Sequence, residues 1–407
     1  MAKLTRERKN KTVYRLVGES QTQGLIFNRA ASGNGPSCVV DGKMLRNFGS
    51  CSYMGLERHP ALLAGAVAAL ENHGSQFSFS RAYLDSPLYQ GLEEALDEIT
   101  GRATLVAPST TLAHLAALPV LVSDDDVVLI DQFAHASLHM ATDLLKGTIV
   151  ERIRHNRMDL LEERIIEYST PGRRIWYLCD GVYSMLGDFA DFVALRELLG
   201  RYPQLHVYAD DAHAVSWTGK HGRGAALSHL GDSDRVVVAL SLNKAFSAAG
   251  GALALPSPSL RTQIRRCGGP MLFSGPIQPP MLGAAVASAQ LHLDGGFPLL
   301  QAELAERIAA AKDEIARLNV PVATADWTPI FMVQFEALRA AQLAVRELRE
   351  RDYYCCLSTF PAVPMDKPSL RFTVSRHNSI TEIREFVAQL ADVVAGRGDT
   401  QASAYAS

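Results

Sequence analysis

The stretch Arg235-Val-Val-Val-Ala-Leu-Ser-Leu-Asn-Lys244 decides the fold class of this sequence. Its apolar run from 236 to 240 predicts a strand that is buried on both faces, as the strands of parallel sheets are. The strand delivers Lys244 to the edge of the sheet, and ligands of such sheets bind beyond the carboxyl ends of the strands. Lys244 is therefore a candidate for a residue that carries a cofactor.

Polar side chains follow other strands of the same kind. His135, Asp180 and Asp210 each come just after an apolar run, and His213 lies three residues beyond Asp210. These runs alternate with helical stretches between about 103 and 255, which is typical of right-handed crossover units and a mainly parallel sheet. The sequence therefore predicts that these side chains and the lysine converge on one crevice.

This set of groups suits pyridoxal 5'-phosphate (PLP). The cofactor needs a lysine that holds it as a Schiff base, a carboxylate that keeps its pyridine nitrogen protonated, and donors for its phosphate. Lys244 and Asp210 meet the first two needs, because the negative charge of a carboxylate raises the pKa of a nearby nitrogen. A lone lysine is usually a surface residue and a lone buried histidine usually a polar core group, so the order and spacing of the set carry the prediction.

The length of the chain predicts more than one domain. Its 407 residues exceed the ~250–300 that one hydrophobic core supports. We expect an N-terminal arm over 1–45, with a hairpin turn at Asp41-Gly42, then a large PLP-binding domain over 46–295 and a small C-terminal domain over 296–407. The residues after 396 are expected to fray.

Charge and cysteine content exclude several classes of protein. The 40 basic and 43 acidic residues give a net charge of −3, so no strong field recruits nucleic acid or anionic lipid. Six scattered cysteines form no C-x-x-C pair, which predicts reduced thiols and a cytoplasmic protein. No apolar run approaches the ~20 residues of a membrane helix, and the first residues lack the apolar middle of a signal peptide. We expect neither a nucleic-acid partner nor a membrane partner, and no metal site.

Local signals predict several helices. One begins at Pro60, and Leu62, Leu63, Val67 and Leu70 fall at helical spacing as expected packing residues.

Capping signals place two more helices. Ser86-Pro87 is typical of an N-cap followed by the first helical position, and the residues from Ser379 to Glu382 form a capping box before the last helix. Long helical stretches are also expected over 299–318 and 339–351.

Several blocks occur in the order of one known family. They are Asn47-Phe-Gly-Ser-Cys-Ser-Tyr-Met-Gly-Leu56, Asp131-Gln-Phe-Ala-His-Ala-Ser137, Arg154-His-Asn156, Asp180-Gly-Val-Tyr-Ser-Met-Leu-Gly-Asp188, Asp210-Asp-Ala-His213, and Pro361-Ala-Val-Pro364 followed by Leu370-Arg371. From about 45 to 393 the sequence resembles the α-oxoamine synthases, PLP enzymes that join an amino acid to an acyl thioester with loss of carbon dioxide. The resemblance implies the α/β architecture of PLP-dependent transferase fold type I. In that fold a mainly parallel central sheet forms the large domain and a smaller α+β domain lies C-terminal to it.

The resemblance also implies roles for individual residues. Lys244 would hold PLP, Asp210 would pair with the pyridine nitrogen, His135 would stack on the ring, and His213 would hydrogen-bond its phenolic oxygen. Arg371 would clamp the substrate carboxylate, a task that suits its planar fork of donors. It could equally form an ion pair inside the small domain.

The phosphate would be bound where a helix begins, by the amides of Thr110, Thr111 and Leu112, and by Ser241. The partner subunit's Ser274 would complete the site, since the family is homodimeric. Ser241 and Ser274 could instead be turn or cap residues.

The sequence departs from the family pattern near the phosphate. Ser109-Thr-Thr-Leu-Ala-His114 stands in place of Ser-Gly-x-x-Ala-Asn, and 73–81 lacks the usual run of glycines. Asn243 and Gly275 stand where the family has hydroxyl side chains. These departures predict rearranged phosphate contacts and favour a synthase of specialised biosynthesis.

The function expected is decarboxylative condensation of an amino acid with an acyl thioester, from coenzyme A or an acyl-carrier protein, to an α-aminoketone. A PLP aminotransferase is the alternative, because it uses the same lysine and aspartate. A noncatalytic PLP-fold subunit or a regulator is disfavoured, because Lys244 is present and no basic helix-turn-helix region precedes the fold.

Overall fold

The computed structural model describes residues 6–33 and 35–395. The chain forms two compact units, one of 1–53, 184–188 and 302–407, and one of 54–183 and 189–301. We call them the terminal unit and the sheet unit. The domain boundaries expected near 45 and 295 remain a prediction, and the expected fraying after 396 falls outside the described residues.

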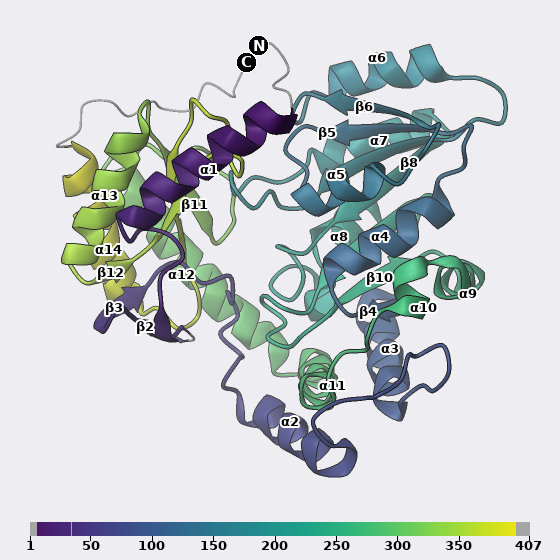
Figure 1. Cartoon of the computed structure of the whole chain (residues 1–407), viewed down its shortest axis with the longest axis horizontal. Helices are drawn as coiled ribbons and strands as arrows, with labels where there is room; N and C mark the ends of the chain where they lie inside the picture. The colour runs from purple at the N-terminus through teal and green to yellow at the C-terminus, as the bar shows by residue number, and fades with distance from the viewer. Residues whose placement is uncertain (1–5, 34, 396–407) are drawn as a thin grey trace. The chain divides into compact units, whose positions relative to one another are not determined.

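The sheet unit is built on seven strands in the order β4-β10-β9-β8-β7-β5-β6 (Figure 1). The strands are β4 (Ala103–Ala107), β5 (Val127–Asp131), β6 (Ile149–Ile153), β7 (Ile175–Asp180), β8 (Leu205–Asp210), β9 (Val236–Ser241) and β10 (Gly251–Leu255). Neighbouring strands from β9 to β6 pair in parallel, and β10 is antiparallel to both β9 and β4. The mainly parallel sheet predicted from the sequence is confirmed.

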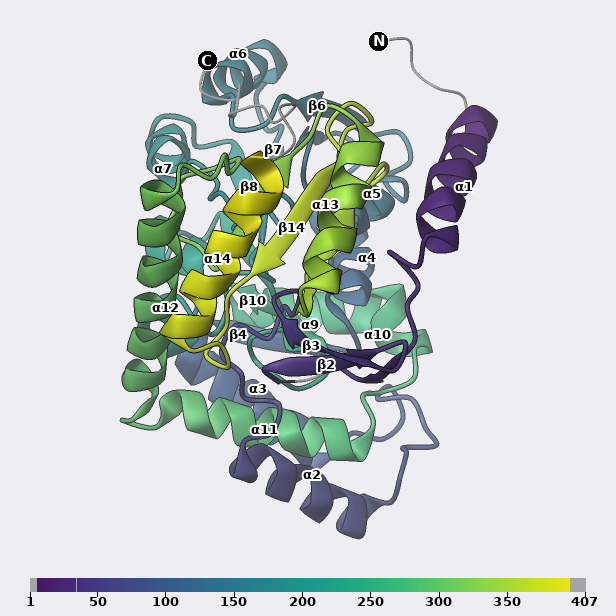
Figure 2. The ribbon, with the colours of Figure 1, turned by 90° about the vertical axis from the view of Figure 1, so that its left-hand side faces the viewer.

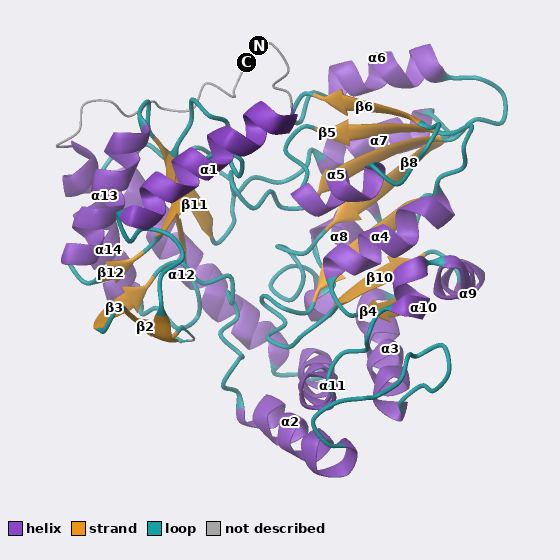
Figure 3. Cartoon of the chain, in the orientation of Figure 1, coloured by secondary structure: helices purple, strands orange, loops and turns teal. Residues whose placement is uncertain are grey.

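Helices cover the sheet (Figure 3), and its strands are largely buried except at the β6 edge, where Ile149 and Val150 are 45% and 39% exposed. The helices of this unit are α2 (Pro60–His73), α3 (Pro87–Thr100), α4 (Thr110–Leu121), α5 (Ala136–Thr142), α6 (Met158–Tyr168), α7 (Phe192–Arg201), α8 (Ala225–Leu230), α9 (Pro258–Cys267), α10 (Gly269–Phe273) and α11 (Pro279–Leu293), with a short 3-10 turn, η1 (Lys220–Gly222). Helix α4 contacts β4, β9 and β10, whereas α7 and α8 pack together and contact β8 and β9. The site described below lies where α4 meets the strand ends.

The packing face expected for α2 is partly wrong. Leu62 is buried, but Leu63, Val67 and Leu70 are 52%, 53% and 44% exposed. Helix α2 instead packs on α11 through small residues, because Gly65 lies against the α11 backbone so closely that a Cβ there would clash. The helical spacing was correct, but three of the four residues form an exposed apolar stripe.

The terminal unit contains two smaller sheets (Figure 2). Their orders are β1-β2-β3-β12 and β11-β14-β13. The elements are α1 (Arg6–Thr22), β1 (Ala30–Ser32), β2 (Ser37–Val40), β3 (Lys43–Asn47), β11 (Ile330–Gln334), α13 (Leu338–Glu350), β12 (Tyr353–Tyr354), β13 (Cys356–Ser358), β14 (Ser369–Thr373) and α14 (Ile380–Ala395). Helix α12 (Phe297–Arg317) begins in the sheet unit and continues into this one.

The N-terminal segment is folded rather than a bare arm over its described residues. Helix α1 is tied to α13, since Gln342 donates to Ser20 Oγ at 3.2 Å and Gln23 donates to Gln342 at 3.1 Å. The expected hairpin turn is present, because β2 and β3 are antiparallel with Val40 opposite Lys43 around Asp41-Gly42.

The capping signals are confirmed. Ser86 Oγ accepts the Leu88 amide at the start of α3. At α14, the Ser379 amide donates to Glu382 and the Glu382 amide donates to Ser379 Oγ, which is a reciprocal capping box. Among the described residues, no helix is both long and apolar enough to cross a membrane.

Candidate active site

The polar side chains predicted to converge lie at the carboxyl ends of adjacent strands. Asp180 ends β7 and Asp210 ends β8, and the two are direct partners in the parallel register. Lys244 follows β9 by three residues, and His135 caps α5 after β5. The strand order β9-β8-β7-β5 therefore brings these four side chains to one edge of the sheet.

Asp210 is the best-defined member of this group. Its Oδ1 accepts the Ala212 amide at 3.0 Å, and its Oδ2 lies 2.9 Å from His114 Nε2. Burial alone would raise the pKa of Asp210, but the electrostatic interaction and hydrogen bond with His114, followed by the positive charge of Lys244, lower it to about 2. Asp210 is therefore ionised at neutral pH.

His135 is held in place by its backbone as well as by its ring. Its amide donates to Asp180 Oδ1 at 2.9 Å, and its Nδ1 lies 2.7 Å from Ser137 Oγ. Burial lowers the pKa of His135, and the positive charge of Lys244 adds to that effect against the pull of Asp210. The imidazole is therefore neutral near pH 7, in the form that can accept a proton.

Asp180 supports the site by accepting a hydrogen bond from the His135 backbone. Burial and the nearby charge of Asp210 raise the pKa of Asp180 well above its usual range. Its bond to the His135 amide fixes the start of α5, which is a positioning task.

The turn that carries Lys244 is fixed on both sides. The Leu242 amide donates to the Gly250 carbonyl at 3.0 Å, and Asn243 Oδ1 accepts the Gly250 amide at 2.9 Å. Asn243, which stands where the family has a hydroxyl residue, thus closes the turn.

The residues just after the lysine are held by hydroxyl groups. Ser216 Oγ donates to the Ala245 carbonyl at 3.2 Å, and Ser288 Oγ donates to the Phe246 carbonyl at 2.7 Å. His292 in turn hydrogen-bonds Ser216 Oγ at 2.7 Å. The segment that carries Lys244 is therefore held in place by side-chain hydrogen bonds.

The predicted phosphate donors begin helix α4 beside this turn. The hydroxyl of Thr110 donates to the Leu240 carbonyl at 3.2 Å, which fixes the helix start against the end of β9. Gly251 permits this approach, because a Cβ there would collide with the Thr110 amide. The Leu112 amide donates to the N-cap Ser109 Oγ at 3.2 Å, so a phosphate there would have to share or replace that bond.

The sheet unit also contains the other residues predicted to bind the cofactor, namely Ser241, Thr111, His213 and Ser274. Ser241 is buried opposite Gly251 and its Oγ accepts the Asn243 amide at 3.3 Å. Thr111 is the second residue of α4. His213 is buried after β8, and its carbonyl accepts Trp217 Nε1 at 2.6 Å. Ser274 follows α10, where its amide donates to the Pro270 carbonyl at 3.3 Å.

Arg371 belongs to the terminal unit. Its Nε donates to the Ser184 carbonyl at 2.7 Å, and its Nη2 lies 3.5 Å from Tyr53 Oη and 3.7 Å from Cys51 Sγ. In the part of the chain that the structure describes, no carboxylate forms an ion pair with this buried guanidinium. Among the described residues, the ion pair that was the alternative role for Arg371 is therefore absent.

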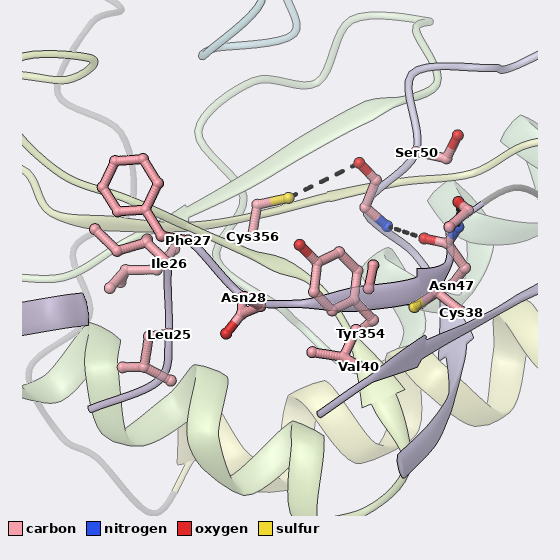
Figure 4. A pocket seen from close by; sticks show the side chains of 14 residues that line it. Leu25, Ile26, Phe27, Asn28, Cys38, Val40, Asn47, Ser50, Tyr354 and Cys356 are labelled. Carbon is pink, nitrogen blue, oxygen red and sulfur yellow. Dashed lines mark hydrogen bonds between the residues drawn. The ribbon is translucent and has the colours of Figure 1, made fainter. Parts of the chain in front are cut away.

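A cavity of about 450 Å³ lies in the same unit (Figure 4). Its lining is largely apolar and includes Leu25, Phe27, Val40 and Tyr354. Cys356, another lining residue, is the register partner of Arg371 in the β13–β14 pair. The cavity is thus lined by β13, the neighbour of the strand that carries the arginine, and its volume is in the range of ~300–1,000 Å³ typical of small-ligand sites.

Comparison with known proteins supplies the family. Residues 43–390 match the family model of aminotransferase class I and II. The 8-amino-7-oxononanoate synthases of Chromobacterium violaceum and Pseudomonas putida are 32% and 33% identical to the chain, over 90% and 89% of its length and 94% and 91% of theirs. This chain belongs to the α-oxoamine synthase family.

The fold of this α-oxoamine synthase is shared with solved structures. Serine palmitoyltransferase from S. paucimobilis superposes with a TM-score of 0.87 at 21% identity, covering 95% of this chain and 98% of that one. The 8-amino-7-oxononanoate synthase of Francisella tularensis superposes with a TM-score of 0.72 at 18% identity, covering 87% and 99%. The predicted fold type I is confirmed, with its seven-stranded sheet and α+β terminal unit.

The family also confirms the predicted cofactor and enzyme class. An α-oxoamine synthase is a PLP-dependent acyltransferase that condenses an amino acid with an acyl thioester. The side chains of the sheet unit fit PLP, because they combine an amine, a buried ionised carboxylate, two imidazoles and the start of a helix.

The sequence did not single out His114 as a site residue, although it lies directly against Asp210. The available signal was the departure at 109–114, where histidine stands in place of the family's asparagine. That departure was interpreted as a change in phosphate binding, whereas the imidazole contacts the carboxylate instead.

Asp211, next to Asp210, predicts how stability depends on pH. Burial raises the pKa of Asp211 to about 7, and its Oδ1 is buried without a hydrogen-bond partner among the described residues. The unfolded state releases this proton near pH ~4, so the free energy of unfolding should fall by about 1.4 kcal/mol per pH unit from there toward pH 7. Denaturant unfolding between pH 5 and 8 measures this slope.

In the variant Asp211→Asn, the free energy of unfolding should lack this part of its pH dependence, because asparagine has no carboxyl group that titrates. The exposed Asp234→Asn is the matched control and should keep the wild-type slope. Equal slopes for wild type and Asp211→Asn would contradict the prediction.

Proposed function

We propose that this enzyme makes an α-aminoketone by decarboxylative condensation of an amino acid with an acyl thioester, in a specialised biosynthetic pathway. The observation that carries the proposal is the convergence of Lys244 with the buried, ionised Asp210 at the ends of β9 and β8. The departures near the phosphate and the use of His114 against Asp210 support a role apart from that of the named relatives.

The side chains of the sheet unit take the following roles. PLP, when bound, supplies an electron sink conjugated to the α-carbon of the amino acid. Lys244 Nζ holds the cofactor and, once released, accepts the proton of the α-carbon. Asp210 keeps a proton on the ring nitrogen, since its own charge is maintained by His114.

The two proposed histidine roles differ. His135, neutral and fixed by Asp180, packs on the ring and can move a proton at its Nε2. His213 donates a hydrogen bond to the phenolic oxygen.

The remaining proposed roles concern binding. The phosphate takes the amides of Thr110, Thr111 and Leu112, the Ser241 hydroxyl and the partner subunit's Ser274. Arg371 binds the substrate carboxylate, which would supply the anion that its described surroundings lack.

The experiment that tests the function measures labelled carbon dioxide released from carboxyl-labelled amino acids, with and without acyl-CoA and acyl-carrier thioesters. Thioester-dependent release supports the condensation and identifies the amino acid and the carrier. Conversion of the cofactor to its pyridoxamine form by amino acid alone, without release, would replace the proposal with an aminotransferase on the same fold.

We also propose that the enzyme is a homodimer and acts in the cytoplasm. Its six cysteines are all unpaired, as expected of a reducing compartment. Phe273, beside Ser274, is 87% exposed, and the stripe of Leu63, Val67 and Leu70 on α2 is also exposed. Such apolar surface is typical of a protein interface.

The dimer predicts a change in oligomeric state. Val67→Asp places a charge in the apolar stripe and is expected to weaken the dimer by about tenfold or more, whereas Val193→Asp, on the exposed face of α7, should not. Sedimentation over a concentration series measures both. A wild type that stays monomeric at high concentration would exclude the homodimer.

A further inference from the structure

His114 lies between two residues of the same strand. It is a fully buried residue of α4, with Nδ1 at 2.9 Å from Tyr208 Oη and Nε2 at 2.9 Å from Asp210 Oδ2. Tyr208 and Asp210 are two residues apart on β8, so their side chains point to the same face of the sheet. The three groups form one continuous hydrogen-bonded chain inside the protein.

The donors and acceptors in this chain have one consistent arrangement for a neutral imidazole. An ionised carboxylate only accepts hydrogen bonds, so His114 Nε2 carries the hydrogen that points at Asp210. Nδ1 is then the acceptor and receives the hydrogen of Tyr208. The phenol thereby fixes the tautomer that donates to the carboxylate, as a partner of one ring nitrogen does in histidine pairs generally.

The hydrogen bonds to Asp210 leave room for a further hydrogen-bond partner of its carboxylate. Its Oδ1 is used by the Ala212 amide and its Oδ2 by His114, and each oxygen keeps one more lone pair. The carboxylate is thus fixed in orientation from two sides. Burial favours the neutral acid, which could not pair with a protonated ring nitrogen, and the interaction with His114 opposes that effect of burial.

We propose that His114 is a positioning residue that, together with Tyr208, holds the Asp210 carboxylate ionised and oriented for the pyridine nitrogen of PLP. The inference rests on the proposed function, because it assumes that Asp210 is the partner of that nitrogen. The family carries asparagine at this place, whose shorter amide presents its donor and its acceptor in a different geometry from the two nitrogens of an imidazole. The relay is therefore a feature of this chain's own sequence.

The test compares PLP with an analogue in which a C–H group replaces the ring nitrogen. His114→Phe keeps a ring in the same space but removes both nitrogens, and is expected to weaken PLP binding by about tenfold or more. His114→Asn retains an amide that can donate to Asp210 and should recover part of the lost affinity, and Tyr208→Phe should show a smaller loss. None of these variants should weaken binding of the analogue relative to wild type, because the analogue has no nitrogen for Asp210 to bind.

Dissociation constants are measured by the change in cofactor absorbance, so the test does not depend on turnover. His206→Asn is the matched control, since His206 is on the same strand and bonds the Gln204 carbonyl instead. If the affinities for PLP and for the analogue fall equally, His114 acts only in packing and the inference is wrong. A PLP affinity of His114→Phe equal to that of wild type would also overturn it. Should His114→Phe fail to fold, His114→Asn and Tyr208→Phe decide by the same comparison. A wild type that binds no PLP would instead remove the proposed function itself.

Discussion

Lys244→Ala is expected to lower turnover by about 10⁴-fold or more. The amine has two tasks in the proposed reaction, since it holds the cofactor and then accepts the α-proton. General base catalysis alone contributes about 10²–10⁴-fold, and loss of the covalent link adds to it. Hydrogen bonds of Asn243, Ser216 and Ser288 fix the turn that carries this side chain. Thioester-dependent release of carbon dioxide measures the loss.

Two controls separate the chemistry of the amine from its charge. Lys244→Arg keeps a cation but cannot hold the cofactor covalently, so it should be as inactive as the alanine variant. Lys146→Ala removes an exposed lysine and should leave turnover unchanged. Appreciable steady-state activity in Lys244→Ala would remove the lysine from its role.

Arg371→Leu is expected to lower kcat/KM for the amino acid by about 30-fold to several thousand-fold. That range corresponds to the ~2–5 kcal/mol lost when one partner of a buried, hydrogen-bonded charge pair is truncated. The guanidinium is buried and oriented by the Ser184 carbonyl, and no carboxylate of the described residues neutralises it. The substrate carboxylate is the anion expected to do so.

The expected loss is mainly in KM for the amino acid, with KM for the thioester little changed. Arg371→Lys keeps the charge without the planar fork of two donors, and its KM for the amino acid should lie between those of wild type and Arg371→Leu. Arg46→Leu removes an exposed arginine of the same unit, paired with Glu385, and is the control. An unchanged KM for the amino acid, together with a lower melting temperature, would assign Arg371 to stability alone.

Much of the fold could be predicted from the sequence because its signals are local. The strand before Lys244 and those before Asp210 and His135 are apolar runs buried on both faces, and that pattern permits little besides a covered parallel sheet. The capping residues Ser86 and Ser379 defined helix starts through bonds to amides two or three residues away. The order and spacing of the polar residues that follow such strands also predicted the cofactor.

Contacts between distant segments could not be predicted in the same way. The stripe on α2 has the spacing of a packing face, but spacing does not tell which surface faces solvent once Gly65 brings α11 close. Asn243 looked like a lost phosphate contact, whereas in the fold it closes the lysine turn.

The sequence by itself determined the sheet, the cofactor class and the residues after each strand, because strand burial and helix capping are written in neighbouring residues. Only the tertiary structure decided that His114 meets Asp210 across 96 positions, and that no described carboxylate pairs with Arg371. A side chain's partners depend on which elements pack against it, and that packing is a property of the whole fold rather than of any stretch of sequence.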